Sequence, residues 1–309
     1  SKHPYIKFIN FRDAIFNMFP DWFDHFMDLY KEEIGLPCTG NIRFDILTEE
    51  TVKKMKECGF DFADVSISGE LDGMSEAEYE QRWLAEKALA GVAGVTIHQT
   101  HGPWRYPPHD ETEALRAERA EVMKRSIRVT AKLGCRYWAI HPLMPFGPDD
   151  DFDPKQFTRI NYDFFRALLP FAKENGVTIC FENMPMKNLS ISTPEKTLEF
   201  VRLIDDENFK MCLDTGHSMV FGIQPTEAVR MAKSDMKVMH VHDNRGKYDE
   251  HLLPYCGIVD WADYRRALDE IGFDGVFSLE CGWKDFLPGA DDDTRADCLK
   301  AIVKRLTAL

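Results

Sequence analysis

The sequence has 309 residues, of which 44% are hydrophobic and 29% are charged, a size and composition typical of one globular α/β-barrel domain. Its net charge of −14 and pI near 5.2 oppose nucleic-acid binding, because such binding depends on Lys and Arg contacts to phosphate. It contains no apolar run of about eighteen residues and no basic-then-apolar leader, so we expect no membrane span, no signal peptide and a soluble, cytoplasmic protein.

The first forty residues are rich in aromatic side chains. Asp21 is positioned to cap a helix whose apolar stripe includes Trp22, Phe23, Phe26 and Tyr30. This apolar stripe can be buried in two ways: it packs on the wall of the following domain, or it forms an interface between copies of the chain in a homo-oligomer. We therefore predict an aromatic-rich N-terminal segment over residues 1–40, packed on a barrel over residues 41–309.

From Asn41 onward a unit repeats, in which an apolar segment is followed by an amphipathic helix and then by the next apolar segment. Such alternation predicts a parallel sheet, and seven or eight units favour a single-domain (β/α)8 TIM barrel over an open sheet. No GxGxxG follows the first predicted strand, which weakens a dinucleotide-binding fold. The predicted strand stretches are Ile42–Ile46, Phe62–Ile67, Val95–Trp104, Tyr137–Pro142, Val177–Asn183, Phe209–Asp214, Val238–Arg245 and Gly275–Glu280. The predicted helices are Thr48–Cys58, Ser75–Ala90, Glu111–Leu133, Pro154–Asn175, Thr193–Ile204, Pro225–Ser234, Trp261–Ile271 and Asp293–Thr307.

Ligand-type side chains stand at the carboxyl end of almost every predicted strand. In the stretch Val238–Arg245, two-residue alternation places His240 and His242 on one face and the apolar Met239 and Val241 on the other. A barrel carries its chemistry at the carboxyl ends of its strands, so these side chains are expected to converge. The strand ends carry His98, His101, His141, Glu182, Asp214, His240, His242 and Glu280, and His217 and His251 fall in loops at the same mouth.

Four of these residues predict a divalent-metal site. Glu182, Asp214, His240 and Glu280 offer carboxylate oxygens and one imidazole nitrogen, which suit Mn, Co, Mg or Zn with positions left open for water or substrate. No thiolate lies among them, which disfavours a structural zinc. The eight cysteines of the chain form no CxxC pair, and we expect them to be reduced core thiols.

Five motifs, in order, resemble the xylose-isomerase-like TIM-barrel superfamily, which includes sugar-phosphate isomerases and epimerases and the endonuclease IV type of nuclease. They are CFENMP at Cys180–Pro185, CLDTGH at Cys212–His217, HVHDNRG at His240–Gly246, DEHLLPYCGIVDW at Asp249–Trp261 and FDGVFSLE at Phe273–Glu280. The resemblance extends from about Asn41 to Leu309. The sequence departs from it where isomerase members often carry a Gly-Glu-Gly turn, because Pro254-Tyr255-Cys256-Gly257 stands there.

For the isomerase and epimerase members, the resemblance implies one metal held by the four residues above, with Glu182 and Glu280 also acting as acid and base through an enediolate. It further implies that His217 and Arg245 bind substrate oxygens. Trp104, in the loop after the strand that carries His101, is expected either to stack on a sugar face or to pack on the wall. His101 and His251 complete the predicted substrate-binding set.

Three alternatives stay open. A related branch cleaves oxidised C-glycosides with an imidazole base, so a lyase using His141 competes for the same site. The nuclease branch implies a trinuclear zinc phosphodiesterase that adds His101 or His98, His141, His217 and the Asp249-x-His251 pair. A non-catalytic sugar-binding barrel is the third. We predict a metal-dependent sugar isomerase or epimerase that acts on a small carbohydrate, with no nucleic-acid or membrane partner.

Overall fold

The computed structural model describes residues 9–11, 38–40, 56, 61–104, 110–146, 153–281, 287, 289–290 and 292–307. The chain forms two compact units, Ser1–Thr48 and Glu49–Leu309. In the first unit, β1 (Ile9–Phe11) pairs in parallel with β2 (Cys38–Gly40). The predicted aromatic helix after Asp21 and the predicted strand Ile42–Ile46 lie outside the described residues.

Seven parallel strands in the described part of the second unit form one sheet, and each pairs with the next strand along the chain. They are β3 (Phe62–Ser66), β4 (Thr96–His101), β5 (Tyr137–Ile140), β6 (Thr178–Glu182), β7 (Phe209–Asp214), β8 (Met236–Val241) and β9 (Ser278–Leu279). The sheet curls until its two edges meet, because the Ser278 hydroxyl on β9 lies 3.3 Å from a carboxylate oxygen of Asp64 on β3. The result is a nearly closed barrel, which confirms the predicted TIM-barrel fold.

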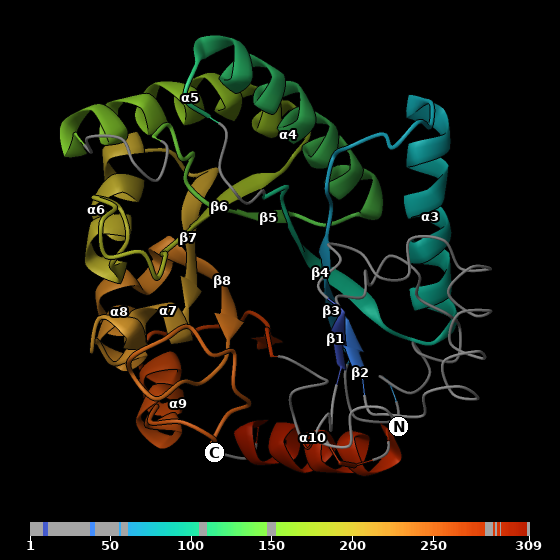
Figure 1. The fold of residues 1–309 in the computed structure, drawn as a ribbon, viewed down its shortest axis with the longest axis vertical. Coiled ribbons are helices and arrows are strands. Elements are labelled where there is room, and N and C mark those ends of the chain that lie inside the picture. The colour runs from blue at the N-terminus through green and yellow to red at the C-terminus, as the bar shows by residue number, and fades with distance from the viewer. Residues whose placement is uncertain are drawn as a thin grey trace, which may run out of the picture. The chain divides into compact units, whose positions relative to one another are not determined.

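Helices connect the strands and lie outside the curved sheet (Figure 1). They are α3 (Glu76–Val92), α4 (Glu113–Leu133), α5 (Pro154–Glu174), α6 (Pro194–Ile204), α7 (Thr215–Val220), α8 (Pro225–Ala232), α9 (Trp261–Glu270) and α10 (Asp292–Thr307). Most boundaries follow local capping chemistry. Ser75 and Glu78 form a reciprocal capping box at the start of α3, and Gly134 ends α4 in the left-handed conformation.

Alternation along each strand separates two apolar layers. Met239 and Val241 on β8 pack into the main core between sheet and helices, while Val238 joins a small cluster with Cys180 and Cys212. These two thiols are buried and free, as expected for reduced core cysteines, but Cys256 is free and exposed, so the expectation of a core position is wrong for that residue. Among the described residues, no helix is both long enough and apolar enough to span a membrane.

Candidate metal centre at the carboxyl ends of the strands

Four ligand-type side chains meet where consecutive strands end. Glu182 is the last residue of β6, Asp214 the last of β7, His240 the penultimate residue of β8, and Glu280 follows β9. One ligand atom from each lies within 4.8 Å of the others. The register of the strand pairing helps to bring them together, because Asp214 on β7 is the direct partner of His240 on β8. The sheet therefore brings together the four residues that the sequence predicted as metal ligands.

The polar atoms at the centre of this group lack hydrogen-bond partners. His240 Nδ1 lies 3.1 Å from Glu182 Oε1 and 3.0 Å from Glu280 Oε2. In the described structure, His240 Nδ1, Glu182 Oε2 and Glu280 Oε2 are buried atoms without a hydrogen bond. Converging buried acceptors are costly unless a cation pairs with them. The donor set of carboxylates and an imidazole thus fits a divalent metal ion.

Asp214 is fixed by the turn that follows β7. Its Oδ1 accepts a hydrogen bond of 2.7 Å from the backbone N–H of His217 and so caps α7. Its own N–H donates to the Asn183 side-chain oxygen at 2.8 Å, and the Asn183 amide donates back to the Asp214 carbonyl at 3.0 Å. This short helix, absent from the predicted elements, therefore orients both Asp214 and His217.

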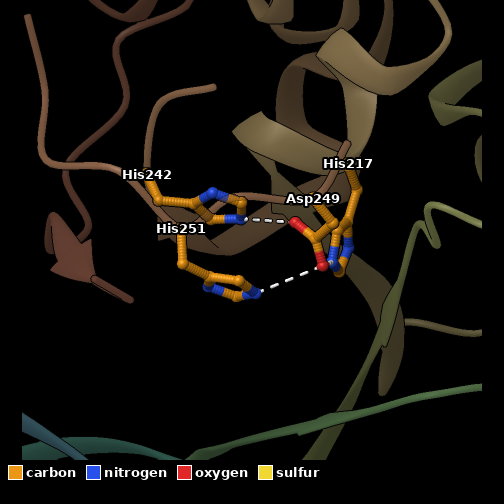
Figure 2. Close-up of side chains that lie close together, drawn as sticks. All are labelled: His217, His242, Asp249 and His251. Carbon is orange, nitrogen blue, oxygen red and sulfur yellow. Dashed lines mark hydrogen bonds and ion pairs between the residues drawn. The ribbon is translucent and has the colours of Figure 1, made fainter. Parts of the chain in front are cut away.

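A second cluster lies beside the first and contains His217, His242, Asp249 and His251 (Figure 2). Asp249 Oδ2 is 3.3 Å from His217 Nε2 and 3.2 Å from His251 Nε2. His242 connects the two clusters, because its Nε2 lies 3.0 Å from Asp214 Oδ1 and 3.7 Å from Asp249 Oδ1. The rings of His242 and His251 stack with centroids 4.1 Å apart.

A pair of histidines approaches the outer oxygen of Glu182. The Nε2 atoms of His101 and His141 each lie 3.3 Å from Glu182 Oε2 and 3.2 Å from each other. The Glu182 carboxylate is therefore shared between this pair and the four-residue site. Glu182 is also one of the most deeply buried acids of the described chain, at 1% exposure.

His98 does not join these groups, in contrast to the sequence-based expectation for the strand ends. Two-residue alternation along β4 places it on the same face as Thr100, which hydrogen-bonds Thr130 of α4. Its ring contacts Phe62 and Tyr137 with centroids 5.7 and 5.6 Å away. Six of the seven histidines assigned to the mouth are thus brought there, and His98 faces the helices instead.

Charge within the clusters shifts the imidazole pKa values. Burial lowers the pKa of His217, but the charges of Asp214, Glu182 and Asp249, together with its hydrogen bond to Asp249, outweigh burial and raise it to about 10. Burial also lowers the pKa of His251, and Asp249 raises it to about 9. Without a metal, protonated imidazoles balance the carboxylates. Metal binding requires unprotonated ligands, so a cation would take over this role and release protons.

Glu182 is held in its ionised form. Burial raises the pKa of its carboxyl group, but the positive charge of His240 and the nearby imidazoles of His101 and His141 move it well below the usual range. His141 behaves in the opposite way, since burial lowers its pKa more than Glu182 raises it. The site therefore combines an ionised carboxylate with an imidazole that favours its neutral form.

The remaining predicted substrate contacts lie at the rim. Trp104 is 61% exposed. The Arg245 side chain is 64% exposed and forms an ion pair with Glu250 at 2.5 Å. Sequence reasoning missed Asp64, a carboxylate on β3 that lies 3.2 Å from His240 Nε2. The only available signal was a lone acid within an otherwise apolar strand.

Known proteins share this sequence pattern and fold. A family model described as xylose isomerase-like TIM barrel matches residues 52–305. The D-psicose 3-epimerase of Ruminiclostridium cellulolyticum is 25% identical over 260 residues, covering 78% of this chain and 85% of that protein. The uncharacterized protein MJ1311 of Methanocaldococcus jannaschii is 36% identical over 124 residues, which span 39% of this chain and only 42% of that protein.

Among solved structures, the IOLI protein with a bound zinc atom aligns with a TM-score of 0.64 at 19% identity, covering 83% of this chain and 90% of that chain. This likeness shows the fold alone. The family match covers more than half of the sequence, and it is the family that the five sequence motifs resemble. This chain belongs to the xylose isomerase-like TIM-barrel family.

Proposed function

We propose that the protein is a divalent-metal-dependent sugar epimerase or isomerase that moves a proton on a carbon next to a carbonyl group. The observation that carries this proposal is the convergence of Glu182, Asp214, His240 and Glu280 on one point, with buried acceptor atoms that no hydrogen bond satisfies. The similarity to a D-psicose 3-epimerase confirms the expected isomerase or epimerase class and favours a ketose as substrate.

Glu182 and Glu280 are the proposed acid and base. They belong to different strands and approach His240 Nδ1 separately, at 3.1 and 3.0 Å. Two carboxylates on different sides of a substrate carbon allow one to remove a proton and the other to return it. Glu182 enters this reaction ionised, because the surrounding imidazoles keep its pKa low. Removal of the proton by a carboxylate converts the bound sugar into an enediolate.

Asp214 and His240 would hold the metal together with the two glutamates. A bound divalent cation would supply positive charge beside the carbonyl and hydroxyl oxygens of the substrate. His217 and His251 are the proposed donors to more distant substrate oxygens, because both belong to the cluster beside the metal centre, around Asp249. Trp104, exposed at the rim, is the proposed stacking surface for the sugar.

The test begins with protein stripped of metal and reloaded separately with Mn, Co, Mg or Zn. Each form is offered a panel of ketohexoses and ketopentoses, and the products are separated from their epimers by chromatography. We expect turnover only after reloading, loss of turnover in Glu182→Gln, and parent activity in the surface control Glu199→Gln. Metal-loaded Glu182→Gln that matches the parent would overturn the proposal. Oxidised glycosides belong in the same panel, since elimination with His141 as the base would be seen there.

A second candidate, a trinuclear zinc phosphodiesterase, is favoured by the two neighbouring histidine groups. His101 and His141 meet at Glu182 Oε2, and His217 and His251 meet at Asp249 Oδ2, so each group offers a further cation position. The net charge of −14 opposes a nucleic-acid substrate. Elemental analysis separates the two functions, because near three zinc ions per chain with cleavage of abasic DNA favours the nuclease.

A further inference from the structure

The two ring nitrogens of His240 have opposite surroundings. Nδ1 faces the carboxylates of Glu182 and Glu280 at the candidate metal centre. Nε2 points away from that centre toward Asp64 Oδ2, at 3.2 Å. The ring is 1% exposed and stacks against His101, with centroids 5.4 Å apart. An imidazole held in this way presents one nitrogen to a metal only if its proton resides on the other.

Asp64 is itself fixed by two further donors. The Gln99 side-chain amide donates a 2.7 Å hydrogen bond to Asp64 Oδ2, and the Ser278 hydroxyl lies 3.3 Å from the same oxygen. Gln99 is 1% exposed, and its amide nitrogen also lies 3.5 Å from the Met239 carbonyl oxygen, so it cannot readily turn. An oxygen that already receives these donors acts as an acceptor toward His240, which requires a proton on Nε2.

We propose that Asp64 is a positioning residue that holds His240 with its proton on Nε2 and thereby directs the Nδ1 lone pair toward the metal centre. The inference rests on the proposed metal site but concerns a residue outside the four-ligand set. Carboxylates that accept from the far nitrogen of a metal-bound histidine fix its orientation, and losing one typically weakens metal binding about 10–100-fold. Asp64 is not a proposed metal ligand and is not a proposed acid or base.

A purely structural role is the competing explanation, since Asp64 also links β3 to β9 through Ser278. Two variants separate these roles. Asp64→Asn keeps the size of the side chain but removes its negative charge, which weakens the hold on the His240 Nε2 proton. Ser278→Ala removes the hydroxyl that contacts Asp64 from β9 but leaves the Asp64 carboxylate beside His240.

The experiment is a Co²⁺ titration of metal-free protein, followed by the visible absorption of the bound ion. We expect Asp64→Asn to bind about 10–100-fold more weakly than the parent, and Ser278→Ala to bind within about twofold of it. Thermal unfolding of both metal-free variants monitors folding. Asp64→Asn that binds Co²⁺ as tightly as the parent would overturn the proposal, whereas a parent that binds no metal would overturn the proposed function as well.

A second measurement needs no variant at Asp64. In Zn²⁺-loaded protein labelled with ¹⁵N-histidine, long-range proton–nitrogen correlations identify which nitrogen of each ring carries a proton. The His240 signals are assigned by their loss in His240→Gln. We expect a protonated Nε2 and a metal-bound Nδ1. A metal-bound Nε2, or a proton on Nδ1, would overturn the assignment of Asp64 even if the variant failed to fold.

Discussion

Replacement of Gly216 by alanine tests how tightly the two clusters are packed. A Cβ atom on Gly216 would lie 1.9 Å from Cε1 and 2.2 Å from Nδ1 of His242, far inside van der Waals contact. The His242 ring is fully buried, lies 3.0 Å from Asp214 Oδ1 and stacks on His251. The ring cannot move away without disturbing Asp214, a proposed metal ligand.

The expected loss of stability follows from three contributions. Alanine is favoured over glycine inside a helix by about 1 kcal/mol, which would stabilise α7. Overpacking a buried site costs about 1–3 kcal/mol. Loss of the hydrogen bond between His242 and the buried Asp214 carboxylate adds about 1.5–3 kcal/mol. We therefore expect Gly216→Ala to lower the free energy of unfolding by about 1.5–5 kcal/mol.

The assay is urea unfolding of the parent, Gly216→Ala and a matched control, Gly91→Ala. Gly91 also lies within a helix, α3, but a Cβ atom there meets nothing within 4 Å. The control should be as stable as the parent or more stable by up to about 1 kcal/mol. A Gly216→Ala variant as stable as Gly91→Ala would show that the His242 ring is not tightly packed against Gly216. We also expect Gly216→Ala to bind Co²⁺ more weakly, because Asp214 is displaced.

Three further predictions concern chemistry, pH and local structure. Glu182→Gln and Glu280→Gln, each confirmed to be folded and metal-loaded, should lose about 10²–10⁴-fold in turnover, and parent rates would exclude them as acid and base. In metal-free protein, the raised pKa values of His217 (about 10) and His251 (about 9) stabilise the fold fully below their ordinary value of 6.5. The unfolding temperature should therefore fall as pH rises from 6.5 through 10, and a rise over this range would contradict the assigned ion pairs. Asp243 is fully buried and accepts hydrogen bonds of 2.9, 3.2 and 3.0 Å from three N–H groups. Asp243→Ala should therefore lower the free energy of unfolding, measured in urea, by about 3 kcal/mol or more. A loss below about 1 kcal/mol would count against this network.

The strand-end residues that sequence reasoning placed correctly share one property: each stands at the end of a largely apolar segment. In β8, alternation alone placed His240 on the face opposite Met239 and Val241, and the structure agrees, because Met239 and Val241 pack in the main core while His240 faces the metal centre. Parallel strands then carry such side chains to one edge of the sheet whatever the exact boundaries. The fold and the four-residue group were therefore predictable before the structure.

Features that depend on side-chain contacts were not predictable in this way. The helix α7 has only six residues, and it begins because Asp214 caps it, although the same acid looks like a strand end in the sequence. His98 and His101 are three positions apart and so fall on opposite faces of β4. Asp64 belongs to no motif, and its importance emerges only from its distance to His240, a residue far along the chain.

Deuterium incorporation tests most directly whether two carboxylates at a metal centre transfer a proton beside a carbonyl group. Metal-loaded protein is incubated with each ketose in deuterated water, and product and recovered substrate are analysed by NMR and mass spectrometry at low conversion. The proposed function predicts an epimer or isomer that carries one solvent deuterium at the reacting carbon, while recovered substrate stays largely unlabelled, because different groups remove and return the proton. Product without deuterium, or no labelled product from any ketose under any of the four metals, would contradict it.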